Sequence, residues 1–265
     1  MYEQRLCAFV DILGFSDLIE RSLKQPPLHQ KIRQLLREVI DAKPIWKQDS
    51  SIDLIEARLT AQGVPNPRSE AEQTAARYAV AERGTSFSDS LVLSVTLDAH
   101  AIRGLVTSLL LLSRSLAELG GYVRGGVSNG LLCHEEDMCF GPAQIAAYKL
   151  EKCVAVYPRI VVAPDAHEAI AAVDTDVADP LASYFRTDSD GKIFLNFLTP
   201  QVFGQFNSFL HEEQMRAISK ELSHQLLRVQ PANPAREKLI WLARYFNSVL
   251  KDAPISGMES LSIER

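Results

Sequence analysis

The chain has 265 residues, enough for one large domain or two small ones, since a typical domain has about 150 residues. Apolar residues make up 46% and charged residues 23%, a balance that excludes a disordered, collagen-like or wholly coiled-coil protein. The formal net charge is −5, with acidic and basic residues interspersed, so the sequence gives no general electrostatic reason to bind nucleic acid.

The apolar segments are too short to span a membrane. The longest unbroken run of leucine, isoleucine and valine is Leu109–Leu112, far below the ~20 apolar residues that a bilayer-spanning helix needs. The residues before Asp11 lack the apolar core and cleavage site of a signal peptide, so we expect a cytoplasmic protein with no membrane partner. The four cysteines form no CxxC pair and the six histidines no HxxxH pair, which predicts reduced packing thiols, no zinc site and no disulfide framework.

The first half of the chain predicts a strand, two helices and a hairpin. Leu6–Val10 is a short apolar run typical of a buried strand, and Ser16 is a candidate N-cap for a helix that follows it. A second helix is expected around Ile32–Ile40, whereas residues 48–84 have the weakest pattern and predict an excursion. Thr85–Val95 is rich in β-branched and apolar residues and predicts a hairpin that turns at its serine-rich centre.

The second half alternates strands and helices and then becomes helical. Ala101–Leu119 repeats leucine at helical spacing, and Gly120 supplies a C-terminal stop. Further strands are expected at 122–127, 138–140, 159–163 and 193–198. Further helices are expected at 143–152, after Asp165 as an N-cap, at 207–228 and after Asn233-Pro234. Helices packed on a mostly antiparallel sheet predict the α+β class.

Two aspartates lie at the ends of predicted elements, one at the end of the first strand and one in the hairpin turn. Asp11 ends the strand and Asp89 lies in the hairpin turn, and in this order of elements the hairpin can return beside the end of strand one. Two close carboxylates need either a raised pKa or a bound cation such as Mg²⁺ or Mn²⁺. The alternative is that Asp11 caps a helix and Asp89 is an ordinary turn residue.

Two further segments are candidates for contact with phosphate. Gly14-Phe15-Ser16 lies between the first strand and its helix, where free amide groups can hold a polyphosphate. Arg124 precedes Gly125-Gly126 on a strand that the glycines leave open, as if a ligand approached the backbone there. The alternative is that Arg124 is an ordinary exposed arginine on a strand.

Four segments occur together in one order, namely Phe9–Ser16, Phe87–Ser90, Arg124–Gly130, and Phe140–Ala143 continuing to Leu150-Glu151. Together they resemble the catalytic domain of the class III nucleotidyl cyclases. The resemblance covers roughly residues 5–200, so we expect a ferredoxin-like catalytic domain over 1–200 and a helical extension over 201–265 packed on it.

The resemblance also implies roles for individual residues. It assigns two divalent ions, Mn²⁺ or Mg²⁺, to the carboxylates of Asp11 and Asp89 and the carbonyl of Ile12. The residues that would bind the triphosphate are Gly14, Phe15, Ser16 and Arg124.

The sequence departs from the family pattern at several places. Thr85 and Met138 stand where adenylyl cyclases of the family have a base-selecting lysine and aspartate. Ile145 and Lys149 replace an asparagine and a transition-state arginine, and Lys149 keeps the charge but loses the planar fork. Lys192 falls near a position where the family has a phosphate-binding lysine. The alternative is that Lys192 is a solvated lysine in a turn.

With Tyr148 beside Lys149, this combination looks like the bacterial pyrimidine cyclases of Pycsar anti-phage systems. The resemblance implies a homodimer with active sites at its interface that converts UTP to cyclic UMP and pyrophosphate, with Thr85 and Tyr148 beside the substrate. A separate effector protein would sense the product. The alternatives are a cytidylate cyclase making cyclic CMP, a purine cyclase, a degenerate module that binds nucleotide without turnover, and an interaction protein that uses the helical tail.

Overall fold

The computed structural model describes residues 1–40, 83–135, 138–174, 180–200, 208–252 and 261–263. The predicted excursion over 48–84 lies outside these residues, apart from its last two positions, which belong to a strand. The described part of the chain is a mixed α+β structure with a mostly antiparallel open sheet, as the order of elements predicted.

The sheet has the order β2-β3-β1-β4-β6-β8-β7, and β5 pairs with β4. Neighbouring strands are antiparallel except for β4 and β6, which run parallel. The strands are β1 (Glu3–Leu13), β2 (Arg83–Phe87), β3 (Ser90–Thr96), β4 (Tyr122–His134), β5 (Cys139–Phe140), β6 (Ile160–Val162), β7 (Phe185–Thr187) and β8 (Ile193–Leu195). The hairpin of β2 and β3 turns at 88–89, which confirms the predicted position of Asp89.

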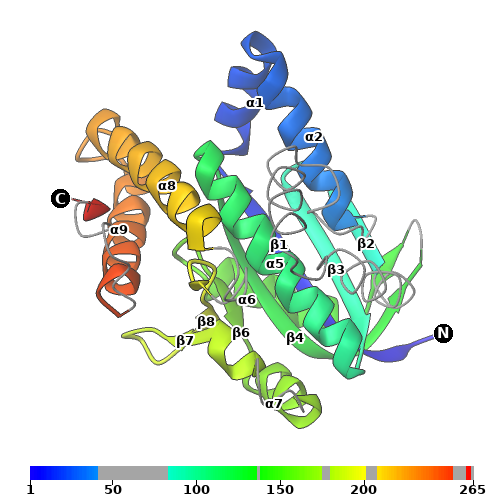
Figure 1. The fold of residues 1–265 in the computed structure, drawn as a ribbon. Helices are drawn as coiled ribbons and strands as arrows, with labels where there is room; N and C mark the ends of the chain where they lie inside the picture. Colours follow the sequence, from blue (N-terminus) through cyan, green and yellow to red (C-terminus); the bar gives the residue numbers. More distant parts are fainter. Residues whose placement is uncertain (41–82, 136–137, 175–179, 201–207, 253–260, 264–265) are drawn as a thin grey trace, which may run out of the picture.

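Helices cover the sheet and continue beyond it at the C-terminal end. They are α1 (Phe15–Lys24), α2 (Pro26–Ile40), α5 (Ala99–Leu119), α6 (Pro142–Cys153), α7 (Pro164–Val173), α8 (Ser208–Arg228) and α9 (Pro234–Asp252), with a short 3₁₀ helix at Leu181–Tyr184. Figure 1 shows α5 crossing in front of the sheet. None of the described helices has the length and apolar character needed to cross a bilayer.

The strict alternation along β1 separates two faces of the sheet. Val10 and Ile12 are buried in the main core, to which α5 contributes most of its leucines. Cys7 points to the opposite face, where it packs with Ala143 and Ala147 of α6. Because side chains alternate between faces in a strand, Asp11 lies on the same face as Cys7, the face covered by α6.

The ends of the helices follow local chemistry, and two predicted caps are wrong. Asp98 caps α5 by accepting a 2.9 Å hydrogen bond from the backbone N–H of Ala101, and Gly120 ends the helix with a left-handed φ of 83°. Ser16 does not cap α1, because the helix already begins at Phe15 after a left-handed Gly14. Asp165 likewise lies inside the first turn of α7, which begins at Pro164.

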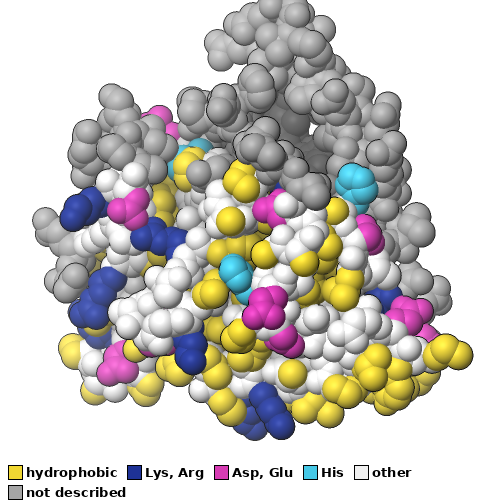
Figure 2. Space-filling model, turned by 90° about the horizontal axis from the view of Figure 1, so that it is seen from below, with side chains coloured by type: hydrophobic (Ala, Val, Ile, Leu, Met, Phe, Trp, Pro, Cys, Tyr) yellow, Lys and Arg dark blue, Asp and Glu magenta, His cyan; other side chains and the backbone are white. Residues whose placement is uncertain are grey.

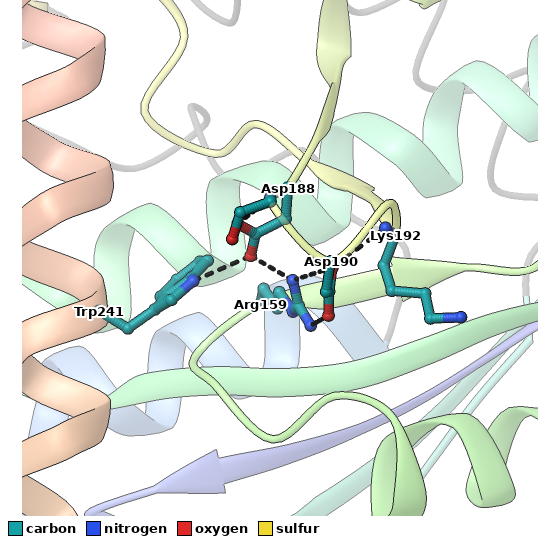
Figure 3. Close-up of polar contacts among 6 residues, drawn as sticks. Arg159, Asp188, Asp190, Lys192 and Trp241 are labelled. Carbon is teal, nitrogen blue, oxygen red and sulfur yellow. Dashed lines mark hydrogen bonds and ion pairs between the residues drawn. The ribbon is translucent and has the colours of Figure 1, made fainter.

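The C-terminal helices contact the sheet and its helices at several points. Gln225 of α8 donates a 2.8 Å hydrogen bond to the carbonyl of Gly120 at the end of α5. Trp241 of α9 donates a 2.9 Å hydrogen bond from Nε1 to Asp188 in the turn between β7 and β8 (Figure 3). The division of the chain into domains at residue 200 stays a prediction, since these contacts describe packing and not independent folding.

The turn between β7 and β8 is held by a buried cation. Arg159 is 1% exposed, and its guanidinium forms ion pairs with Asp188 and Asp190 (Figure 3). Arg159 also lies over the ring of Trp241, which is stacked on Tyr157 with centroids 5.5 Å apart. The two carboxylates neutralise the buried charge of Arg159. Together with Trp241, the cluster links the start of β6 to the turn and to α9.

The surface carries mixed charge. Figure 2 shows Lys and Arg side chains interspersed with Asp and Glu side chains on the described part of the face seen from below, and hydrophobic side chains along its lower edge. The four cysteines are free thiols, but they are not all packing residues as predicted, because Cys153 is exposed at the end of α6.

Candidate functional site

The structure brings Asp11 and Asp89 together at one end of β1. Asp11 is opposite Ser90 in the pairing of β1 with β3, so the hairpin turn lies directly beside it. The backbone N–H of Ile12 donates a 2.9 Å hydrogen bond to the carbonyl of Asp89, which fixes the turn to the end of the strand. Ser88 makes the turn possible by adopting a left-handed φ of 58°.

The carboxylate of Asp11 lies in an environment that disfavours its charge. Burial raises the pKa of Asp11, the guanidinium of Arg124 acts in the opposite direction, and the negative charge of Asp89 raises it further. The two carboxylates are therefore close enough to repel each other. A divalent cation between them would remove that repulsion.

Arg124 lies on β4 directly opposite Asp11 and contacts two carboxylates. Its Nη2 donates a 3.1 Å hydrogen bond to Oδ2 of Asp11, and the same nitrogen forms an ion pair with Glu151 of α6. Glu151 is 4% exposed, and burial raises its pKa while Arg124 lowers it. Arg124 is therefore part of a charged cluster, which contradicts the alternative of a surface strand arginine.

Sequence reasoning gave Glu151 no role, although it stands at the end of one of the matched segments. A glutamate among lysines near the end of a helix is usually exposed. The signal that could have revealed it is its spacing from Ala143 and Ala147, which are buried on the same face of α6.

The glycines beside Arg124 are packed against protein, Gly126 against α6 and Gly125 against β1, so the interpretation that a ligand approaches the backbone there is wrong. A Cβ atom on Gly126 would lie 2.4 Å from Cβ of Leu150 and 2.5 Å from the carbonyl oxygen of Ala147. Gly125 is equally confined on the other face, where a Cβ would lie 2.6 Å from Val10. The absence of a side chain at Gly126 lets α6 bring Glu151 to Arg124.

The candidate phosphate loop stands at the start of α1, three residues beyond Asp11. Gly14 is exposed and has a left-handed φ of 80°, and its carbonyl accepts the first helical hydrogen bond, from Leu18 at 3.1 Å. Phe15 packs its side chain partly against the main core, whereas Ser16 is exposed. Phosphate contact at this helix start would therefore come from the backbone and Ser16.

Thr85 lies on the same face of the sheet as Asp11, since it pairs with Val92, which pairs in turn with Phe9. Its Oγ1 hydrogen-bonds Nε2 of His134 at 3.0 Å. Nδ1 of the same ring hydrogen-bonds Oγ of Ser94 at 2.8 Å. No pattern in the sequence indicates His134, because it lies 49 residues from Thr85 and in no recognisable motif.

The exposed side of α6 carries the other predicted substrate residues. Tyr148 packs edge-on against Phe9 with ring centroids 5.3 Å apart, and it accepts a 3.1 Å hydrogen bond from Lys152. Lys149 is exposed, and within the described residues no hydrogen bond or ion pair joins it to Asp11. The fold therefore brings Tyr148 to the sheet, whereas Lys149 is exposed on α6.

Thr85 is half-buried, but other positions at which the sequence departs from the cyclase pattern are exposed. Met138 and Ile145 are 51% and 52% exposed. Lys192 is exposed at the turn between β7 and β8, where its backbone N–H donates a 3.0 Å hydrogen bond to Asp190 (Figure 3). Its contacts are those of a turn residue.

The atoms that could bind a metal ion at the candidate site are oxygens. The described residues contain no group of three or more His, Cys, Asp or Glu side chains that could hold a metal ion. The site instead offers the carboxylates of Asp11 and Asp89 beside the backbone of Ile12, an oxygen donor set that suits Mg²⁺ or Mn²⁺ with water completing the coordination. This donor set and the mutual repulsion of the two carboxylates fit a hard divalent cation.

Comparisons with known proteins add no family to this description. A scan against protein-family models finds no match, and a search of the curated proteins also finds none.

Proposed function

We propose that the chain is a class III nucleotidyl cyclase that converts UTP to 3′,5′-cyclic UMP and pyrophosphate in the cytoplasm. The observation that carries the proposal is the meeting of Asp11 and Asp89 at the end of β1, with Arg124 opposite Asp11. The α+β fold and the order of the four matched segments support it.

In this proposal, Asp11 and Asp89 hold two divalent ions together with the carbonyl of Ile12. Bound there, Mg²⁺ or Mn²⁺ would lower the pKa of the ribose 3′-hydroxyl and neutralise the triphosphate. The chain itself would position the nucleotide, with Gly14 and Ser16 at the phosphates.

Arg124 would stabilise charge that develops on the phosphoryl oxygens during in-line attack of the 3′-oxygen on the α-phosphorus. Glu151 holds the guanidinium from the side of α6, so the arginine keeps one partner when a cation takes its place at Asp11. The leaving group is pyrophosphate, and most of the rate gain would come from positioning.

A second copy of the chain would complete the site. Lys149 is exposed on α6, beside Ile145 and Tyr148, which are 52% and 38% exposed. An interface over this helix would bury apolar surface and bring the lysine of one protomer to the phosphates of the other. We therefore propose a homodimer with two active sites at the interface, whose product a separate effector protein senses.

The proposal is tested by incubating the purified chain separately with ATP, GTP, CTP and UTP in the presence of Mn²⁺. We expect cyclic UMP and pyrophosphate in equal amounts from UTP, identified by mass spectrometry, and none with Asp89→Asn. Cyclic CMP from CTP would move the assignment to a cytidylate cyclase, and a cyclic purine nucleotide would identify a purine cyclase. No cyclic product from any nucleotide would overturn the cyclase proposal.

A nucleotide-binding module without turnover is the second candidate. It is favoured by the exposed Ile145 and Lys149 at the positions of the family's asparagine and arginine. A rise in melting temperature with UTP and Mg²⁺, in the absence of any cyclic product, would support this reading and exclude the enzyme.

A further inference from the structure

Two cysteine side chains from different strands meet on the face of the sheet that α6 covers. Cys7 of β1 is fully buried in a small cluster with Leu132, Ala143 and Ala147. Cys139 of β5 is partly buried and packs against the same cluster. It stands opposite His134 of β4, whose ring hydrogen-bonds Ser94, and Ser94 stands opposite Cys7 in the pairing of β3 with β1. A thiol that is reached from solvent therefore has a second thiol directly behind it.

The surroundings lower the pKa of the outer sulfur and raise the pKa of the inner one. The neighbouring Cys7 thiol holds the pKa of Cys139 below that of an ordinary thiol, and His134 acts in the same direction. The neighbouring Cys139 and burial raise the pKa of Cys7. The outer sulfur is therefore the stronger acid, which is the division of roles between an attacking and a resolving cysteine.

We propose that Cys139 is a peroxide-reactive thiol and that Cys7 resolves its sulfenic acid, forming a disulfide between β5 and β1. The assignment needs neither a nucleotide nor a metal ion, so it is independent of the cyclase proposal. Other cysteines lack this arrangement: Cys153 is exposed, and Cys133 donates its hydrogen bond to Glu135 at 3.5 Å.

The oxidant in this reaction is hydrogen peroxide. The thiolate of Cys139 attacks one peroxide oxygen, the O–O bond breaks, and hydroxide leaves as the sulfenic acid forms. The sulfur of Cys7 then attacks the sulfur of Cys139, its proton passes to the departing oxygen, and water leaves. The two thiols together lose two electrons, and the peroxide is reduced to the level of water.

Both thiols belong to one cluster on the same face of the sheet, so the second step needs only a local approach of the two side chains. The sulfurs must close to about 2 Å to form the covalent bond. The new bond would tie the end of the β4–β5 hairpin to the middle of β1, four residues before Asp11 on the same face.

The first experiment treats the reduced full-length chain with hydrogen peroxide and alkylates the remaining thiols for peptide mass spectrometry. We expect one disulfide-linked peptide pair that joins Cys7 to Cys139, a mass loss of two hydrogens, and full reversal by dithiothreitol. Iodoacetamide should also modify Cys139 about tenfold faster than Cys153 at pH 7, because an ordinary thiol is only a few per cent thiolate at that pH.

Two variants separate the roles of the sulfurs. Cys7→Ala should leave a sulfenic acid on Cys139 that dimedone traps, with no disulfide, whereas Cys139→Ser should abolish both products. Cys153→Ser is the matched control and should leave the disulfide unchanged. Preferential oxidation of Cys153, a bond from Cys139 to Cys133, or no disulfide in the unmutated chain would each overturn the proposal, and none of these results depends on the folding of a variant.

Discussion

Nη2 of Arg124 lies 3.1 Å from Oδ2 of Asp11, across the pairing of β4 with β1. The same nitrogen contacts the buried carboxylate of Glu151, so one guanidinium stands between two acids. In the metal-free chain this cation offsets part of the cost of burying Asp11. In the proposed enzyme, a divalent ion at Asp11 and Asp89 would compete with this cation, and Glu151 would keep the arginine in place.

The carboxylates themselves provide the first prediction. Asp11→Asn and Asp89→Asn should each weaken Mn²⁺ binding by at least about tenfold, because each removes an anionic oxygen ligand. Isothermal titration of the nucleotide-free chain measures the affinity. Asp17→Asn, at the exposed start of α1, is the matched control and should bind normally. Unchanged affinity in both site variants would show that the proposed metal site does not exist.

Arg124 supplies a prediction that separates charge from geometry. Arg124→Lys keeps the positive charge but cannot contact Asp11, Glu151 and a phosphate with one planar fork. With the nucleotide that the four-nucleotide assay identifies, kcat should fall by about 10²-fold, the usual scale for loss of one transition-state donor. Arg216→Lys on α8, where the arginine pairs with Glu212, should leave kcat unchanged. A rise in KM alone would mean that Arg124 only binds substrate.

Glu151 makes stability depend on pH in a defined direction. Its pKa is raised in the folded chain by burial, so above the ordinary carboxyl pKa of about 4.3 the folded state holds a proton that the unfolded state has lost. Stability in EDTA should therefore fall as pH rises from that value through the raised pKa. The melting temperature of Glu151→Gln, relative to the unmutated chain, should increase over the same range.

Glu213→Gln, on the exposed side of α8, controls for the loss of one carboxylate. If the difference between Glu151→Gln and the unmutated chain stays constant from pH 4 to pH 8, burial does not destabilise the charge of Glu151. Asp11, whose pKa burial also raises, should respond in the same direction, and Mg²⁺ should suppress its contribution.

The sequence predicted the elements better than the contacts between them. The leucine spacing of α5 and the apolar run of β1 are local signals, and a strand with a hairpin turn allowed the meeting of Asp11 with Asp89 as one of two alternatives. The contact of Arg124 with Glu151 depends on how closely α6 packs on β4, which no local pattern encodes.

The same limit explains what was missed at the far end of the sheet. β7 has only three residues, too few for a period-two pattern to be recognised. Asp188 and Asp190 have the sequence of an ordinary turn, and only the fold shows that they neutralise Arg159. Polar residues that serve a distant partner resemble solvated ones in the sequence.

The closeness of α6 to β4 can be tested with two glycines on the same strand. Gly126→Ala places a Cβ 2.4 Å from Cβ of Leu150, so α6 must move and the chain should lose about 1–3 kcal/mol in urea denaturation. Gly130→Ala places its Cβ 3.5 Å from Ala143, which is ordinary contact, and should change stability far less. Equal effects would show that α6 is not confined at Gly126.

Trp241 tests how α9 is attached to the sheet. Trp241→Phe removes the hydrogen bond to Asp188 but keeps an aromatic ring on Tyr157, so the unfolding free energy should fall by about 1.5–3 kcal/mol, the usual range for a hydrogen bond to a charged group. Trp241→Ala also removes the ring over Arg159 and should cost more. Lys192→Ala, in the same turn, is the control and should leave urea denaturation unchanged. If Trp241→Phe unfolds at the same urea concentration as the unmutated chain, the hydrogen bond to Asp188 makes no net contribution to holding α9 against the β7–β8 turn.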